Sequence, residues 1–240
     1  MALAHPIKID HNWRRLCAEV RPTMLNVEFA RAQMIAQQVR AWDVFDKRVL
    51  KALAEVHREE FVPEGYRDLA FADTAIPLGH GQSMLPPKIE GRILQALELR
   101  ENDEVLEVGT GSGFLTACLS SLAGRVRSLE IFPDLAALAA RNLRSSGVTA
   151  ASVETMDALR FEEVDRYDAI AVGGSLPRYD ARFERALKPG GRMFIVVGTS
   201  PLMEALLVRR ASGAACTRES LFETDITTLV NAPQPPRFVF

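Results

Sequence analysis

The sequence predicts a doubly wound α/β fold, in which helices cover both faces of a mostly parallel sheet and extra helices precede it. From Glu104 onward, short apolar segments alternate with helical patterns, as a parallel sheet with crossover helices requires. The segments VLEVG (105–109) and YDAIAV (167–172) are largely apolar, which is typical of strands buried on both faces. A glycine-rich turn joins the first of these strands to the following helix, at the place where such folds bind ligands.

The part of the chain ahead of the sheet is predicted to be mainly helical. Asn26 is expected to cap a first helix and Asp46 a second, because each polar residue precedes apolar residues at helical spacing. Segment 71–87 interrupts this pattern with three prolines and two glycines, which exclude a long regular element. A further helix follows, with its apolar face formed by Ile89, Ile93, Leu94 and Leu97.

The sheet itself is predicted from five apolar segments separated by helices or turns. Two helices are expected, one over 113–122 and one that begins at Pro133 and stops at Gly147. The LKPGG sequence at 187–191 is expected to be the turn before the last of these strands. The predicted strands are 105–109, 126–130, 150–155, 167–174 and 192–198.

The ends of the chain differ from this core. Residues 1–25 form an expected N-terminal extension without a clean period, and 26–240 an expected single domain. Within that domain, 26–100 hold the helices and a substrate loop, 101–200 the cofactor-binding core, and 201–240 the C-terminal strands with a turn near Gly213. Three prolines in the last ten residues exclude a central strand there.

Composition and charge narrow the class of protein. Apolar residues make up 48% of the 240 residues and charged residues 25%, the balance of a soluble globular protein. The formal net charge is only -2, which argues against nucleic acid or a membrane surface as a partner. Three cysteines stand far apart and the four histidines have no metal-ligand spacing, so neither a disulfide framework nor a metal site is expected. A cytoplasmic location follows from this cysteine usage, and the oligomeric state is left open.

The run from residue 107 to 113 carries the clearest chemical information. It ends a predicted strand and opens a helix, where glycines allow close approach of a ligand and free amides attract a carboxylate or phosphate. A dinucleotide fingerprint needs a small residue at position 114, which is Phe114, so a nicotinamide cofactor is disfavoured. The candidate cofactor-binding residues in the run are Glu107, Gly109, Thr110, Gly111, Ser112 and Gly113.

Acidic residues at the ends of the next two strands complete the predicted cofactor site. Glu130 can accept both hydroxyls of a ribose, with Ile131 beside it, and these residues together fit a nucleoside without a pyrophosphate. S-adenosylmethionine is such a ligand, and its amino-acid carboxylate suits the loop amides. Asp157 follows the third strand and can accept an adenine amino group, while Met156 or Ala158 packs against the ring. Asp157 could instead be a solvated strand-end acid.

Across roughly residues 26–200 the sequence resembles the protein-L-isoaspartate O-methyltransferase family of class I methyltransferases. The matching segments are REEFVPEGYRDLAFAD (58–73), IPLGHGQSMLPP (76–87), VLEVGTGSGFLTA (105–117), VRSLE (126–130), YDAIAV (167–172) and LKPGGRMFIVVG (187–198). The glycine loop is common to most class I methyltransferases, whereas 58–87 is far more specific. The resemblance implies a Rossmann-like methyltransferase sheet, S-adenosyl-L-methionine as cofactor, and methylation of the α-carboxylate of isoaspartyl residues in protein repair.

Two positions depart from the family pattern. In the substrate loop, the family's active-site serine is replaced by Leu85, and the threonine two residues earlier by Ser83. The family's glycine-aspartate-glycine after the third strand is Met156-Asp157-Ala158, which keeps the acid. Ser83 is therefore the candidate catalytic residue, although its hydroxyl could equally serve to stabilise the turn. His80, between two glycines, could reach the pocket but is expected to be a solvated loop histidine.

Three functional hypotheses remain open at this point. The first is methylation of isoaspartyl peptides or proteins, which suits the absence of a convincing histidine or cysteine base, because a carboxylate is already ionised at neutral pH. The second keeps the cofactor and takes a small molecule or another macromolecule as acceptor, as the apolar Leu85 suggests. The third is a non-catalytic module that binds S-adenosylmethionine.

Overall fold

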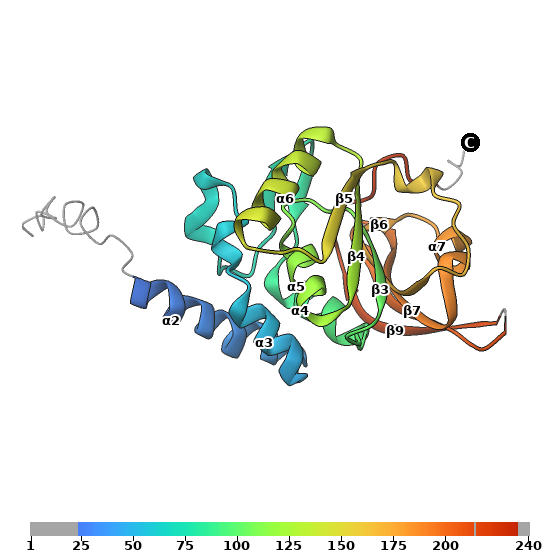
Figure 1. Cartoon of the computed structure of the whole chain (residues 1–240), viewed down its shortest axis with the longest axis horizontal. Helices are drawn as coiled ribbons and strands as arrows, with labels where there is room; N and C mark the ends of the chain where they lie inside the picture. Colours follow the sequence, from blue (N-terminus) through green and yellow to red (C-terminus); the bar gives the residue numbers. More distant parts are fainter. Residues whose placement is uncertain (1–23, 214, 235–240) are drawn as a thin grey trace, which may run out of the picture.

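The computed structural model describes residues 24–213 and 215–234, and these form a seven-stranded sheet with helices on both faces (Figure 1). The strand order is β5-β4-β3-β6-β7-β8-β9, and the first four of these pairings are parallel while the last two are antiparallel. The predicted fold class is therefore confirmed. The strands are β3 (Glu104–Val108), β4 (Arg125–Glu130), β5 (Ala151–Thr155), β6 (Tyr167–Leu176), β7 (Leu187–Thr199), β8 (Leu202–Arg210) and β9 (Cys216–Thr224).

Alternating side chains of the sheet enter two separate hydrophobic cores. Val105 of β3 packs on the same side as helix α5, whereas its neighbour Leu106 packs on the opposite side with Phe183 of α7. Because successive side chains of a strand point to opposite faces, both faces of β3 can be buried only if helices cover each of them. Figure 1 shows α5 and α7 on opposite sides of the sheet. The covering helices are α4 (Pro87–Ala96), α5 (Phe114–Leu122), α6 (Pro133–Ser145) and α7 (Ala181–Ala186).

The N-terminal part is helical, as predicted, but its first helix begins earlier than expected. Helix α2 starts at Met24, so Asn26 lies inside the helix and the prediction that it is the N-cap is wrong. Capping preference is a local signal, and it fails where the preceding residues continue the helix. The Asp46 cap is confirmed, because its side chain accepts the Arg48 amide at 2.8 Å. The elements here are α2 (Met24–Met34), η1 (Ile35–Val39), η2 (Arg40–Trp42), α3 (Lys47–Glu55), η3 (Arg58–Glu60) and η4 (Glu64–Leu69).

Segment 71–87 contains no long element, but it does form a small hairpin. Strands β1 (Ile76–Gly79) and β2 (Gln82–Met84) pair antiparallel as a sheet of their own. The predicted turn at 187–191 is instead the bulged start of β7, where the register with β6 jumps between Tyr167 and Ala169. A short 3-10 helix, η5 (Ala158–Arg160), follows β5.

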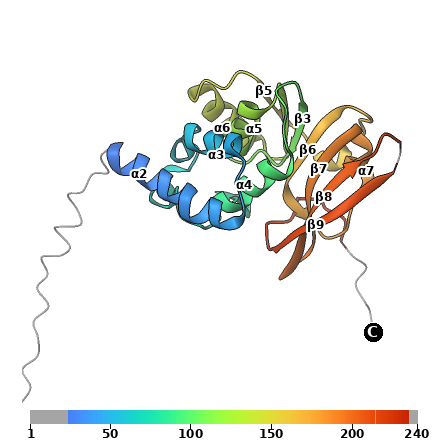
Figure 2. The ribbon, with the colours of Figure 1, turned by 90° about the horizontal axis from the view of Figure 1, so that it is seen from below.

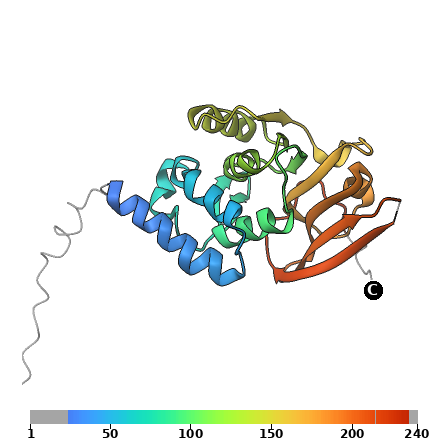
Figure 3. The ribbon, with the colours of Figure 1, turned by 60° about the horizontal axis from the view of Figure 1, so that its bottom comes forward.

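The first described helix and the last hairpin of the sheet lie far apart. Helix α2 and the β8–β9 hairpin occupy opposite ends of the molecule in two further views (Figures 2 and 3). The β8–β9 connection confirms the expected turn near Gly213.

Residues 1–23 of the proposed extension lie outside the described residues, as do residues 235–240 of the proline-containing tail. None of the helices described over 24–213 and 215–234 combines the length and the apolar character that a bilayer crossing needs.

Candidate functional site

The turn from β3 into α5 depends on glycine at three alternate positions. Gly109, Gly111 and Gly113 all have positive φ angles, of 87°, 55° and 89°, which are unfavourable for residues with a side chain. A β-carbon on Gly111 would lie 3.0 Å from Cδ1 of Leu78 in the β1–β2 hairpin. The turn therefore combines a left-handed backbone with close contact from a distant segment, and the sequence satisfies both with glycine.

Glu130 stands at the carboxyl end of β4 and faces this turn. Its side chain is buried, and its carboxylate accepts the Gly111 amide at 2.9 Å and the Phe132 amide at 3.1 Å. The two hydrogen bonds fix the plane of the carboxylate at the edge of a pocket. Hydrogen bonds to an ionised acceptor are stronger than neutral ones, so Glu130 holds the turn and β4 together while presenting its oxygens.

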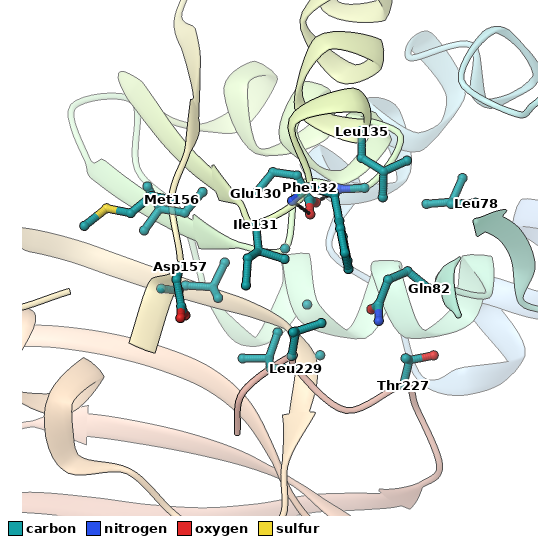
Figure 4. A pocket seen from close by; sticks show the side chains of 18 of the residues that line it. Leu78, Gln82, Glu130, Ile131, Phe132, Leu135, Met156, Asp157, Thr227 and Leu229 are labelled. Carbon is teal, nitrogen blue, oxygen red and sulfur yellow. Dashed lines mark hydrogen bonds between the residues drawn. The ribbon is translucent and has the colours of Figure 1, made fainter. Parts of the chain in front are cut away.

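A pocket with about 700 Å³ of open space lies beyond the carboxyl ends of β3, β4 and β6. In Figure 4, Met156 and Asp157 lie at one end, Gln82 and Thr227 at the other, and Glu130 between them. The predicted site residues that line it are Ser83, Gly109, Gly111, Glu130, Ile131, Met156, Asp157 and Ala158.

Asp157 is the N-cap of η5 and is tied to the C-terminal segment. One carboxylate oxygen accepts the Leu159 amide at 2.9 Å and the other accepts the side-chain amide of Asn231 at 3.0 Å. Its neighbours Met156 and Ala158 also line the pocket. The acid is thus oriented from two directions at the apolar end of the pocket, where a flat ring with an exocyclic amine would fit.

Glu107 lies beneath the glycine turn rather than in the pocket wall. It is fully buried, and one carboxylate oxygen accepts the hydroxyls of Thr116 at 2.5 Å and Ser128 at 2.6 Å. Its other oxygen, Oε1, has no hydrogen-bond partner in the described chain. Burial raises the pKa of this carboxyl to about 7, although the two hydroxyls oppose the shift. Glu107 is therefore a buried carboxyl group next to the site, and its direct contact with a cofactor stays a prediction.

The remaining candidates of the glycine run lie around a smaller cavity next to the pocket. Thr110 and Ser112 line this cavity together with Glu90, and the Thr110 hydroxyl is 2.6 Å from that of Ser128. Gly113 is the residue before α5, and a β-carbon there would lie 3.3 Å from that of Ala139. These residues shape the turn and the smaller cavity, whereas Gly109 and Gly111 line both cavities.

Ser83 and Leu85 stand where the pocket meets a third cavity. The Ser83 hydroxyl is 3.2 Å from the hydroxyl of Thr227, and all three residues line both spaces. The third cavity is formed by the chain before and after the β1–β2 hairpin, the β7–β8 connection and the segment after β9. Its remaining lining residues are Ala75, Pro86, Ser200, Met203, Asp225, Ile226 and Thr228. A second substrate in this cavity would reach the first pocket past Ser83.

Several lining residues were not predicted from the sequence. Leu78 and Gln82 come from the hairpin, Phe132 and Leu135 follow β4, and Thr227, Leu229 and Val230 come from the C-terminal segment. Gly173 and Gly174 lie within β6, where its register with β7 shifts, and β-carbons on them would lie 3.1 Å from the Val108 carbonyl and 2.7 Å from Leu229. This glycine pair, at the end of the predicted strand 167–174, was the one local signal for part of the missed wall.

The residues of the pocket fit a nucleoside that carries an amino-acid group. Glu130 offers two fixed acceptor oxygens for vicinal hydroxyls, Asp157 an acceptor for an amine, and Ile131 and Met156 apolar contact for a ring. The smaller cavity beside the glycine turn can take the amino-acid end. Within 24–213 and 215–234 there is no group of three histidine, cysteine, aspartate or glutamate side chains arranged to bind a metal ion.

Comparisons with known proteins agree with this geometry. The family model described as protein-L-isoaspartate(D-aspartate) O-methyltransferase (PCMT) matches residues 30–232. A protein-L-isoaspartate O-methyltransferase of Koribacter versatilis is 37% identical over 210 residues, which are 87% of this chain and 94% of that protein. Protein-L-isoaspartate O-methyltransferase 2 of Pelobacter propionicus is 37% identical over 221 residues, 91% of this chain and 98% of that protein.

Solved structures show the same fold at lower identity. A PCMT-type chain of Plasmodium falciparum, in complex with S-adenosyl-L-homocysteine, superposes with a TM-score of 0.72 at 18% identity, over 83% of this chain and 97% of that one. A second structure, a protein-L-isoaspartate O-methyltransferase, has a TM-score of 0.71 at 21% identity and covers 82% of this chain and 65% of the other. Both likenesses cover more of the chain than the predicted cofactor-binding core of residues 101–200.

Proposed function

The chain belongs to the protein-L-isoaspartate(D-aspartate) O-methyltransferase family, and we propose that it transfers a methyl group from S-adenosyl-L-methionine to the α-carboxylate of isoaspartyl residues in damaged proteins or peptides. The observation that carries this proposal is the family match over residues 30–232, which includes the hairpin, the pocket and the C-terminal segment. We also propose that 26–240 act as one methyltransferase domain. A cytoplasmic location stays a prediction from the cysteine usage.

In the proposed complex, each part of the pocket binds one part of the cofactor. Glu130 accepts the two ribose hydroxyls, and Asp157 accepts the adenine amino group while Ile131 and Met156 contact the ring. Amides of the turn at 109–113 bind the amino-acid carboxylate. Bound S-adenosylmethionine supplies a methyl group on a positively charged sulfur. These assignments are supported by the positions of the carboxylates at the strand ends and by their fixed orientation.

The acceptor needs orientation rather than a base. A carboxyl group with a pKa near ~4 is already ionised at neutral pH. Its oxygen forms a bond to the methyl carbon as the carbon–sulfur bond breaks, the electron pair of that bond stays on sulfur, and no proton moves. We assign to Ser83 the role of donating a hydrogen bond to this carboxylate, with Thr227 beside it. Holding the two reactants in line can supply several kcal/mol of the barrier reduction.

The charges around the site suit a reaction that neutralises two ions. Among the described residues that line the pocket and the two adjoining cavities there is no lysine or arginine. The acceptor carboxylate therefore meets no protein cation that would stabilise it before the reaction. Its counter-charge is the sulfonium itself, and both charges vanish when ester and thioether form. A site that excludes water favours such a step.

The proposal is tested with purified protein, methyl-labelled S-adenosylmethionine and an isoaspartyl peptide. A matched peptide with a normal aspartyl residue at the same position is the control. Base-labile label is expected on the isoaspartyl peptide only, because the methyl ester is base-labile and the acceptor geometry differs between the two. Label on the isoaspartyl peptide no higher than on the control would contradict the assignment.

Leu85 favours a second candidate, in which the same cofactor serves a less polar acceptor. Its side chain is partly buried and lines both the pocket and the third cavity, at the position that the family pattern gives to serine. Replacing Leu85 with serine distinguishes the two candidates. A gain of isoaspartyl activity of tenfold or more, about 1.4 kcal/mol, would support a different natural acceptor. Good activity in both forms would exclude it.

A further inference from the structure

The β1–β2 hairpin forms one wall of the cofactor pocket without belonging to the main sheet. Leu78, Gln82 and Ser83 of the hairpin line the pocket, yet the two strands hydrogen-bond as a separate two-stranded sheet. An isolated two-stranded hairpin is only marginally stable by itself. The position of this wall therefore depends on side-chain contacts between the hairpin and the rest of the molecule.

The tip of the hairpin stands away from the body of the protein. Gly79, His80 and Gly81 have φ angles of 97°, 52° and 69°, and β-carbons on the two glycines would meet no atom within 4 Å. A positive φ is uncommon for a residue with a side chain. His80 holds this backbone conformation between two glycines, and its side chain is what returns from the tip to the protein surface.

The imidazole of His80 makes two contacts with the start of α6. It stacks on Phe132 with ring centroids 4.1 Å apart and an angle of 9° between the planes. Its Nε2 lies 2.9 Å from one carboxylate oxygen of Asp134 and 3.1 Å from the other. The hydrogen bond from His80 holds the pKa of Asp134 below its usual range. The expectation of a solvated loop histidine is confirmed, since the side chain is 40% exposed and does not line the pocket, but its ring is also engaged on two sides.

Phe132 links this contact to the ribose-binding position. Its ring lines the pocket, and its backbone amide donates to Oε1 of Glu130 at 3.1 Å. We propose that His80 is a positioning residue for the cofactor: by stacking on Phe132 and pairing with Asp134, it fastens the hairpin over the pocket and fixes the peptide that orients Glu130. This inference rests on the proposed binding of S-adenosylmethionine in the pocket.

The size of the effect follows from the two contacts. A stacked ring pair and a solvent-exposed hydrogen bond are each modest, so together they should change cofactor affinity by about threefold to tenfold. The loss should appear in the dissociation rate of the cofactor and in its KM, because an unfastened wall releases the ligand sooner. The turnover number should change by less than about twofold, since His80 does not contact the acceptor cavity.

The test compares three variants of the full chain. His80→Ala removes both contacts, His80→Phe keeps a ring that can stack on Phe132, and His57→Ala removes another exposed histidine with a carboxylate partner, Glu60, at 3.4 Å. The dissociation constant and dissociation rate of S-adenosylhomocysteine are measured by calorimetry and stopped flow, and KM and kcat with an isoaspartyl peptide. Circular dichroism confirms folding of each variant.

The expected result is a threefold to tenfold weaker and faster-dissociating complex for His80→Ala, a smaller change for His80→Phe, and none for His57→Ala. Equal affinity of His80→Ala and the wild type, or an equal loss in His57→Ala, would overturn the inference. Because the binding measurement needs no acceptor, an unchanged affinity in His80→Ala refutes the positioning role alone. A wild type that binds the ligand but methylates no isoaspartyl peptide refutes the proposed acceptor alone, and a wild type that does not bind the ligand refutes both.

Discussion

Replacing Arg58 with methionine is expected to lower the free energy of unfolding by about 4 kcal/mol at neutral pH. Arg58 is fully buried beneath the substrate loop, and its guanidinium donates to the carboxylate of Glu90 and to the carbonyl oxygens of Ala70 at 2.9 Å and Leu85 at 2.7 Å. Glu90 is itself only 2% exposed. One side chain therefore neutralises a buried acid and satisfies two backbone acceptors from different segments.

The magnitude comes from what the variant would leave behind. Breaking a buried ion pair by removing one partner costs about 3–5 kcal/mol. Each orphaned carbonyl adds up to ~1–3 kcal/mol. These costs overlap, because methionine refills part of the volume and Glu90 can take up a proton. The net loss would be a large part of the ~5–15 kcal/mol that stabilises a typical domain.

The pH dependence of this loss identifies its cause. Burial raises the pKa of Glu90, and in the native protein the Arg58 guanidinium opposes that rise. Without Arg58, folded Glu90 holds a proton at a pH where the unfolded chain, with a carboxyl pKa near 4.5, has released it. With Arg58 present the pKa of Glu90 is already raised to about 8, so the stability of the wild type also falls as the pH rises from 4.5 towards 8. The variant should fall relative to the wild type only above that range, and its destabilisation should be smaller near about pH 7 than near about pH 9.

Urea denaturation followed by circular dichroism at the two pH values measures the effect. The double variant Arg58→Met with Glu90→Met is the matched control, and it should lose only about 1–2 kcal/mol, since no unpaired ion remains and two carbonyls are still unsatisfied. A loss below ~1.5 kcal/mol in the single variant, equal at both pH values, would show that the pair is hydrated and refute the reasoning. A double variant no more stable than the single one would assign the cost to the carbonyls instead.

Three further predictions concern the cofactor site. Glu130→Ala should weaken binding of S-adenosylhomocysteine by about tenfold to a hundredfold, because two charge-assisted hydrogen bonds are lost, and calorimetry giving a change of less than about threefold would contradict its ribose role. Gly111→Ala should weaken binding of S-adenosylhomocysteine, because the new methyl group would lie 3.0 Å from Leu78 and the backbone there is left-handed. An unchanged affinity would show that the hairpin moves to make room for the methyl group. Glu107 has a pKa near 7 in the folded state and an ordinary value of 4.5. The free energy of unfolding should therefore fall as the pH rises between these values, by up to ~3 kcal/mol. Thermal unfolding of Glu107→Gln should show a flatter pH profile, and an unchanged slope would contradict this.

The strand-end acids could be found from the sequence because their positions follow from local periodicity. Glu130 is the last residue of β4 and Asp157 comes two residues after β5, and in a parallel sheet the carboxyl ends of neighbouring strands meet at one edge. The glycine turn was equally local. The family resemblance then supplied Ser83 and the substrate loop, which periodicity alone describes only as irregular chain.

Other parts of the site have no local signal. The contact of His80 with Phe132 joins positions about fifty residues apart, and that of Ser83 with Thr227 joins segments separated by 144 residues. Neither pair shows a spacing or composition that would link its members. The Asn26 error has the converse cause, because a residue suited to an N-cap occupies the interior of a helix that starts at Met24. Long-range contacts decide the first case, and a sequence pattern reports only near neighbours.

The C-terminal segment after β9 connects the two ends of the pocket, and this explains why it belongs to the functional site. Thr227 meets Ser83 at the acceptor end, and Asn231 holds Asp157 at the opposite end. Between them, the Thr227 carbonyl accepts the amide of Ser175 and the amide of Leu229 donates to the carbonyl of Ser175, both at 2.9 Å, so the segment is fixed to β6. A displacement of this segment would therefore alter the proposed acceptor and adenine contacts together. In this proposal the acceptor and cofactor sites share one structural support, even though the residues assigned to each ligand come from different parts of the chain.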